Sequence, residues 1–212
     1  LLSIFPMPLH NGGANAGPGT SNPSTTSITL STSATGTSVS LIPGANFKLS
    51  EVADTAAFDI TTDNFTGYNV KLIAADDAQT LVNTVDNTKV INSITTPILE
   101  SNFVRSNPSL INHWGIKPSK YYDTSTSSTI TNTTTILPGP TSTGTMLDVT
   151  NAANSTANNY SIAIGAMVDG DIPSGTYIRE TTIAATSNPI YYTLTYDKNT
   201  TDTVANLPAP DS

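Results

Sequence analysis

The sequence predicts an all-β protein, and three observations lead to that class. Charged residues make up only 11% of the 212 residues, against roughly 25% in soluble domains. Serine, threonine and asparagine take their place, and β-branched threonine suits a half-wet strand better than an exposed helix. Short runs of alternating apolar and polar residues recur between turn residues. These features favour an antiparallel β-sandwich, immunoglobulin-like or jelly-roll-like, with an extended N-terminal arm.

The arm is the apolar run LLSIFPMPL, residues 1–9. It is too short to span a bilayer, which needs about 20 apolar residues, and two prolines interrupt it. We therefore expect a segment of the mature protein that packs against another surface. Its large apolar side chains are Leu1, Leu2, Ile4, Phe5 and Leu9.

Residues 11–24 are rich in glycine, proline and asparagine and have no periodicity, so they form a linker. Arm and linker together cover residues 1–24. The body, residues 25–212, is one β-sandwich or two β subdomains that meet near residues 125–140.

Strands are predicted wherever the alternation is clear. The first four runs are TTSITLS (25–31), TSVSLIP (37–43), AAFDITT (56–62) and GYNVKLIAA (67–75). The middle, residues 76–87 and 92–112, has room for a helical turn or two between strands, because Pro97 and Pro108 prevent long helices.

Strand signals resume after the middle segment. They cover residues 112–118, 120–124, 128–138 and 143–150. A loop is expected at 151–159. The last three runs, 158–168, 174–187 and 189–197, are the cleanest and predict a meander of neighbouring antiparallel strands. Both faces of the run from Thr176 to Thr186 mix polar and apolar residues, which suits a strand at the border of an assembly as well as an ordinary strand.

Charge and cysteine content exclude several partners. The net charge is -8, with 8 Lys and Arg against 16 Asp and Glu, so the chain lacks the basic surface that nucleic acid or an anionic membrane requires. No cysteine is present, which removes disulfides and thiolate metal sites.

Catalytic and metal signals are weak, and we predict neither an enzyme nor a cofactor. Asp169 and Asp171 flank Gly170 and are a weak Ca²⁺ candidate, but Ca²⁺ takes roughly 6 to 8 oxygen ligands. A turn explains them better, because Pro173 and Gly175 follow. Asp76-Asp77 is interpreted likewise as a solvated loop. The two histidines, His10 and His113, come without a nucleophile motif.

Aromatic residues offer a weak sugar-binding platform. The candidates are Trp114, Tyr121 and Tyr122, with Tyr191 and Tyr192 as a further pair. Adjacent strand residues point to opposite faces, so one tyrosine of each pair is expected in the core.

Two modifications are considered from the residues alone. A Lys-Asn isopeptide bond would use Lys48, Lys71 or Lys89, although no pattern selects one. The matches to N-x-[ST] indicate surface positions more than glycosylation. They are Asn64, Asn132, Asn154, Asn159 and Asn199.

Four segments in order, FTGYNVKLIAADD, NHWGI, YSIAIGAMVDGDIPSGTYIRETTIAATSNPI and YTLTYDKNTTDTVANLP, carry a family resemblance over roughly residues 35–208. The chain resembles the secreted surface proteins of Saccharibacteria and related ultrasmall, host-attached bacteria, and its end is similar to the lead-in of internalin-type β-grasp repeats. It departs from that pattern where Ile116 and Lys117 follow Trp114-Gly115, and where it stops at Ser212 before a complete repeat. The resemblance implies an exported, non-catalytic β-sandwich.

Two functions are expected from these features. The first is a non-enzymatic extracellular structural subunit at the cell surface, in a pilus-like filament or surface assembly whose copies bind one another head to tail. There the apolar arm adds as a strand to the sheet edge of a neighbouring copy. The alternative is a surface adhesin or carbohydrate-binding module whose partner is a glycan. The arm could also fold back on its own body.

Overall fold

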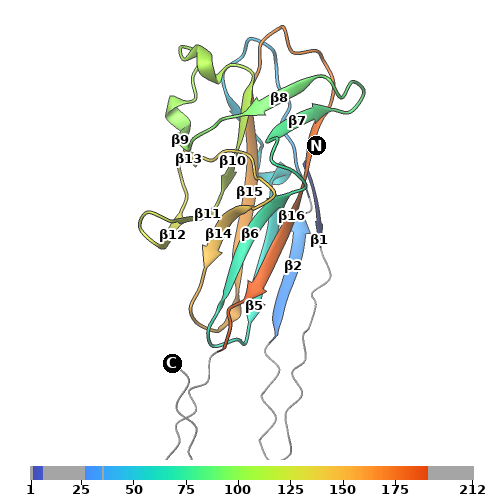
Figure 1. Cartoon of the computed structure of the whole chain (residues 1–212). Coiled ribbons are helices and arrows are strands. Elements are labelled where there is room, and N and C mark those ends of the chain that lie inside the picture. The colour runs from blue at the N-terminus through green and yellow to red at the C-terminus, as the bar shows by residue number, and fades with distance from the viewer. Residues whose placement is uncertain (1, 7–26, 35, 191–212) are drawn as a thin grey trace, which may run out of the picture.

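The computed structural model describes residues 2–6, 27–34 and 36–190 (Figure 1), without the side chains of 2–6, 33, 34 and 54. The all-β prediction is confirmed. The described helices are three 3-10 turns of three residues each, η1 (Val52–Asp54), η2 (Glu100–Asn102) and η3 (Pro108–Leu110). None of the helices within this described part is long and apolar enough to cross a membrane.

The strands follow one another closely along the chain. The first eight are β1 (Leu2–Pro6), β2 (Ile28–Ala34), β3 (Gly36–Thr37), β4 (Lys48–Leu49), β5 (Ala56–Thr62), β6 (Tyr68–Ala74), β7 (Thr80–Asn83) and β8 (Val90–Ser93). The others are β9 (Ile98–Leu99), β10 (His113–Pro118), β11 (Lys120–Asp123), β12 (Ser128–Thr131), β13 (Thr135–Ile136), β14 (Thr145–Val149), β15 (Asn154–Met167) and β16 (Tyr177–Ser187).

Twelve strands pair into one mixed sheet in the order β14-β6-β16-β7-β8-β10-β15-β5-β2, with β1, β3 and β4 attached beside this path. The strand β16 joins the two halves, because its first two residues pair with β7 and residues 181–187 pair with β6. Two small ladders, β11-β12 and β13-β9, lie outside the sheet. The antiparallel sandwich in its stricter form, with two separate sheets, stays a prediction.

One hydrophobic cluster contains buried residues from both halves of the path. Phe58 of β5 and Tyr160 of β15 stack with their ring centroids 4.9 Å apart. The hydroxyls of Tyr160 and of Tyr68 on β6 form a hydrogen bond of 2.9 Å. Strands from before and after residues 125–140 alternate in the sheet, as in β14-β6-β16 and β15-β5.

Alternation correctly predicts β5 and β6. Every second residue of each strand is buried, beginning with Ala56 in β5 and Tyr68 in β6. Between them Gly67 has φ +80°, and a Cβ there would lie 2.2 Å from the carbonyl oxygen of Thr150. Only glycine fits this turn.

The predicted meander of the last strands is wrong in its pairing. β15 pairs with β10 and β5, whereas β16 pairs with β6, β7 and β1. The segment between them therefore crosses from one half of the sheet to the other and forms no hairpin. Alternation shows which residues share a face, but it carries no information on the neighbouring strand. The predicted strand at 189–197 lies almost wholly outside the described residues.

Two further expectations need correction. Residues 80–83, assigned to a segment with helical turns, form β7, which pairs with β8. The expected loop at 151–159 is strand from Asn154 onward, with an irregular register against β5 between Asn154 and Asn158. The first part of this strand is mostly exposed and carries polar side chains, so the sequence shows no apolar alternation there. The helical turns expected in 92–112 are η2 and η3.

Candidate functional site

The arm forms strand β1, which lies beside β16 in the sheet (Figure 1). It also pairs with β3, so β1 lies between these two strands. It runs parallel to β16, with Leu2 opposite Arg179 and Pro6 opposite Ile183. On its other side Leu2 and Ser3 pair antiparallel with β3. We call the edge formed by residues 179–183 of β16 and residues 36–37 of β3 the arm slot. Leu1 and Leu9 of the predicted arm lie outside the described residues.

Burial alternates along the arm slot. Arg179, Thr181 and Ile183 are buried, whereas Glu180 is exposed and Thr182 is half-buried. The buried residues stand at the register positions of Leu2, Ile4 and Pro6. Since paired residues of neighbouring strands share a face of the sheet, the slot distinguishes alternate residues of the strand that fills it. The buried face of this run is mixed, as predicted, because two of its three buried residues are polar.

The side chain of Arg179 is 7% exposed, and its guanidinium is held by the loop that follows β6 and by the segment before β14. Nη1 donates to Oδ1 of Asp76 at 2.7 Å, and Nη2 donates to the backbone oxygens of Asp76 and Pro140. The neighbouring Asp77 accepts from the backbone and hydroxyl of Ser142. The interpretation of Asp76-Asp77 as a solvated loop fits the 61% exposed side chain of Asp76. It did not predict that Asp76 pairs with the buried side chain of Arg179. The available signal was an arginine on an alternating strand.

This ion pair predicts a pH dependence. The backbone N–H of Ala78 and the guanidinium of Arg179 hold the pKa of Asp76 below its usual value. A carboxyl whose pKa is lowered by folding stabilises the protein above its unfolded pKa, and this contribution is lost as pH falls through the folded pKa. We expect the free energy of unfolding to fall below about pH 4. Asp76→Asn should therefore destabilise more at pH 7 than at pH 2.5, as measured by urea unfolding; an equal loss at both would contradict this assignment.

A cavity of about 480 Å³ opens where β16 begins, at one end of the arm slot. Its walls come from the segment after β3, from β7, β8 and β15, and from the crossover before β16. The large apolar residues among them include Val39, Leu41, Leu81, Ile91, Ile164 and Tyr177. The cavity is therefore suited to an aliphatic side chain rather than to a charged ligand.

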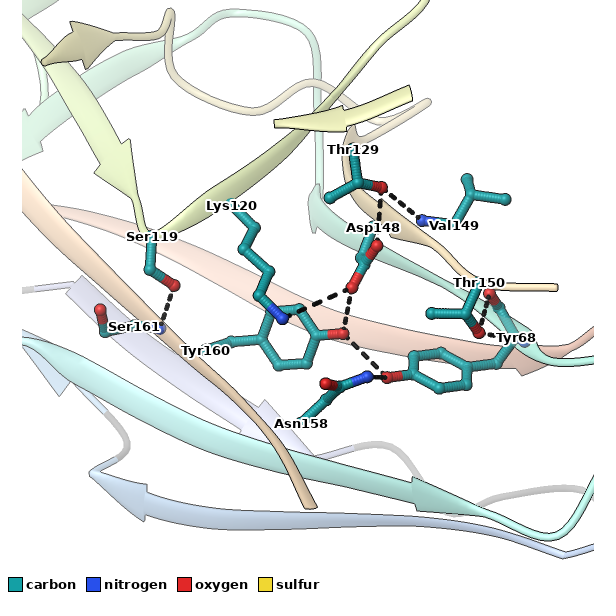
Figure 2. Close-up of polar contacts among 10 residues, drawn as sticks. All are labelled: Tyr68, Ser119, Lys120, Thr129, Asp148, Val149, Thr150, Asn158, Tyr160 and Ser161. Atoms are coloured by element: carbon teal, nitrogen blue, oxygen red, sulfur yellow. Dashed lines mark hydrogen bonds and ion pairs between the residues drawn. The ribbon is translucent and has the colours of Figure 1, made fainter. Parts of the chain in front are cut away.

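A second feature is a buried polar network around Asp148 (Figure 2). Asp148 of β14 accepts hydrogen bonds from the hydroxyls of Tyr160 and Thr129. The ammonium of Lys120 lies 3.9 Å from Asp148 and 4.8 Å from the centroid of the Tyr160 ring. The hydroxyl of Tyr68 extends the network through a hydrogen bond with the hydroxyl of Tyr160.

The network links strands of both halves of the sheet. Its members come from β6, β11, β12, β14 and β15, and Asn158 adds a hydrogen bond from Nδ2 to the Tyr68 hydroxyl. Burial and the neighbouring Asp148 carboxylate raise the pKa of Tyr160 far above its usual value, so its hydroxyl stays a donor. Both carboxylate oxygens of Asp148 are paired. We interpret this network as a structural polar core, which holds five strands in one arrangement.

Trp114 cannot belong to a sugar-binding platform, so this candidate is corrected. Its ring is 0% exposed, and Nε1 donates to the backbone oxygen of Gln79 at 3.1 Å. The sequence could not distinguish a strand-end tryptophan in the core from one in a loop. Tyr121 and Tyr122 are half-buried on β11, where Tyr121 packs against the main hydrophobic cluster. Tyr191 and Tyr192 lie outside the described residues.

The acidic pair after β15 forms a turn, as predicted. The backbone N–H of Ile172 donates to the backbone carbonyl oxygen of Asp169 at 3.1 Å. Asp169 also pairs with Arg105 at 2.9 Å, and Asp171 accepts from Nδ2 of Asn112. Among the described residues no group of three histidine, cysteine or acidic side chains could hold a metal ion. His113 is half-buried, with Nδ1 2.8 Å from the Ile111 oxygen, and His10 lies outside.

The modification candidates fare differently. Asn64 and Asn132 are buried and hydrogen-bonded, so the expectation that these sequons mark the surface is wrong for both. Their amides serve as turn-stabilising groups instead. Of the three lysines considered for an isopeptide bond, Lys48 faces the exposed Glu51 at 4.0 Å. Lys120, which sequence reasoning did not single out, lies 3.9 Å from the buried carboxylate of Asp148.

No protein-family model, no curated protein and no solved structure matches the chain. The resemblance to Saccharibacteria surface proteins and to internalin-type proteins therefore stays a prediction. The arm slot, in which β1 pairs with β16 and β3, is the candidate functional site.

Proposed function

We propose that this protein is a non-enzymatic, extracellular structural subunit of a pilus-like filament or surface assembly, whose copies join by strand donation. The observation that carries the proposal is the position of β1. A strand from the N-terminal arm lies between β16 and β3 and pairs with both. A sheet that accepts a separate, tethered strand at this edge has the form that donation from a second copy requires.

The tether is long enough for exchange. Residues 7–27 connect β1 to β2, and fully extended they span at most about 70 Å. The longest strand, β15 with 14 residues, is about 46 Å long. The arm can therefore reach the slot of a second copy while its own body stays folded. The slot presents the same backbone groups in either copy, so a donated strand can pair with it as a resident strand does.

A filament follows from one arm and one slot per copy. When the arm of each copy fills the slot of the next, one slot stays free at one end and one arm at the other, so the contact does not close. An unfilled slot exposes an unpaired strand edge, which invites pairing with another chain. The low content of charged residues and the many serine, threonine and asparagine residues support a place outside the cell, where filaments of this kind function.

The test compares the intact chain with a variant that lacks residues 1–9. After concentration and warming below the unfolding midpoint, we expect filaments from the intact chain and dispersed particles from the variant in negative-stain electron microscopy. The variant keeps its slot, so adding it to the intact chain should shorten the filaments.

A peptide of residues 1–9 provides the matched control. It should bind the shortened variant and block growth, whereas the same peptide with Ile4 and Phe5 replaced by aspartate should do neither. If the intact chain stays monomeric under all these conditions and the shortened variant binds no peptide, strand donation is refuted and β1 is an ordinary strand of a monomer.

A further inference from the structure

The arm slot continues beyond the end of β1. The register places Leu2 opposite Arg179 on β16 and opposite Thr37 on β3. Two residues before Arg179 on the same face of β16 stands Tyr177, and Val39 stands two residues after Thr37. Both Tyr177 and Val39 line the cavity of about 480 Å³. A strand that extended past Leu2 would therefore project a side chain into this cavity.

The described register leaves polar groups in the slot unpaired. Within the described part of the chain, Nε of Arg179 and Oγ1 of Thr181 are the buried side-chain atoms without a hydrogen-bond partner. Arg179 is 7% exposed and Thr181 is 3% exposed. Buried hydrogen-bond donors are nearly always paired in folded proteins. Leaving a donor of a charged side chain unpaired costs more free energy than leaving a neutral hydroxyl unpaired. The occupant of the slot should therefore bring an acceptor to Arg179.

The arm contains a matching pair of residues. Ser3 is the single polar residue in LLSIFPMPL, and Leu1 stands two positions before it. This spacing equals that between Arg179 and Tyr177. A single shift of the strand can therefore place Ser3 opposite Arg179 and Leu1 opposite Tyr177. A serine hydroxyl can accept a hydrogen bond from Nε of Arg179, while a leucine fills the apolar cavity.

We infer that an arm donated by a second copy pairs one residue further along the slot than β1 does in its own chain. Ser3 then lies opposite Arg179, and Leu1 lies opposite Tyr177 in the cavity. The inference rests on the proposed strand donation and adds the register and the two side chains that specify it. A one-residue shift exchanges the faces of a strand, so Leu1, Ser3 and Phe5 take the buried positions.

The opposite shift is less favourable. It would bring Ser3 to Thr181 but would put Leu1 opposite Arg179, away from the cavity. A hydrogen bond to a charged group contributes more than one between two hydroxyls. The apolar cavity and the unpaired guanidinium nitrogen therefore select the same direction.

Cysteine pairs can measure the register, because the chain has no cysteine of its own. Glu180 is exposed at the middle of the slot. One population carries Glu180→Cys, and a second carries either Ser3→Cys or Ile4→Cys. After mixing and assembly, a thiol-bridging reagent about 5 Å long joins directly opposite residues. Covalent dimers on a denaturing gel then report pairing between copies alone.

The inferred register predicts dimers from Ile4→Cys with Glu180→Cys, and few from Ser3→Cys with Glu180→Cys. The reverse result would mean that donated and resident arms share one register, which refutes the inference and keeps strand donation. If neither mixture gives dimers and a single chain with Ser3→Cys and Glu180→Cys bridges internally, the arm stays in its own chain and the proposed function also fails.

A second readout uses the cavity. Leu1→Asn should weaken assembly roughly tenfold or more, the factor expected for a lost buried leucine. Leu2→Asn is the matched control and should change assembly little. Both variants alter a terminal segment outside the body, so thermal unfolding of the body serves as the check on folding. A stronger effect from Leu2→Asn than from Leu1→Asn would overturn the inferred register.

Discussion

Replacing Asp148 with alanine is expected to lower the free energy of unfolding by about 3–5 kcal/mol, the usual loss when one partner of a buried charge network is removed. The carboxylate is buried and accepts from Tyr160 and Thr129. Its removal leaves both hydroxyls and the nearby Lys120 ammonium without this acceptor, and the buried Tyr160 hydroxyl lies where water replaces the carboxylate poorly. Urea unfolding followed by circular dichroism measures the change.

The matched control is Glu51→Ala. It removes the same charge from an exposed ion pair with Lys48, which should change the free energy of unfolding by at most about 1 kcal/mol. Tyr160→Phe should fall between the two variants, because it removes one donor and keeps the carboxylate. A loss from Asp148→Ala no larger than that from Glu51→Ala would refute the structural role of the network.

Trp114→Ala is the second substitution with a large expected effect, again about 3–5 kcal/mol. The indole is fully buried, and it packs so closely on Gly139 that a Cβ there would lie 2.5 Å from Cζ2 of the ring. Removing the ring leaves a cavity, because the rigid strands around it collapse only in part. Trp114→Phe should cost less, since it keeps most of the apolar volume.

The control for this position is Tyr122→Ala, a half-buried aromatic residue on β11. It should destabilise the body much less than Trp114→Ala in the same urea titration. Loss of glycan binding in Trp114→Ala without loss of stability would contradict the buried position of the ring. That result would also return Trp114 to the set of candidate sugar-binding residues.

These two positions act on the body, whereas the proposed function depends on the arm. The body must stay folded while β1 leaves its slot, so the stability of the core limits how far strand exchange can proceed without unfolding. The buried network and Trp114 stabilise strands that do not pair with β1 in the described sheet. A weakened core should therefore lower the temperature at which assembly gives way to aggregation.

Local pattern was enough to predict much of the fold. The alternation in 56–62 and 67–75 predicted β5 and β6 because the side-chain period of a strand is a local property. The turn at Asp169-Gly170-Asp171 was likewise predicted from neighbouring residues. The arm was predicted as an extended apolar segment, and residues 2–6 are a strand.

Contacts between distant residues could not be predicted in this way. Arg179 and Asp76 are 103 positions apart, and no local signal links them. The network around Asp148 joins strands that are far apart in sequence, and Lys120 was not among the lysines that the sequence singled out. Trp114 illustrates the same limit, because an aromatic residue at a strand end has the same local pattern in a core and on a surface.

The sequence by itself determined the all-β class, the position of most strands and the presence of a tethered apolar arm, because propensity, alternation and turn chemistry act over a few residues. The tertiary structure decided which strands are neighbours, where the charged groups are buried and which edge receives the arm. These features depend on long-range pairing, whose energy comes from the joint burial of residues that only the folded chain brings together.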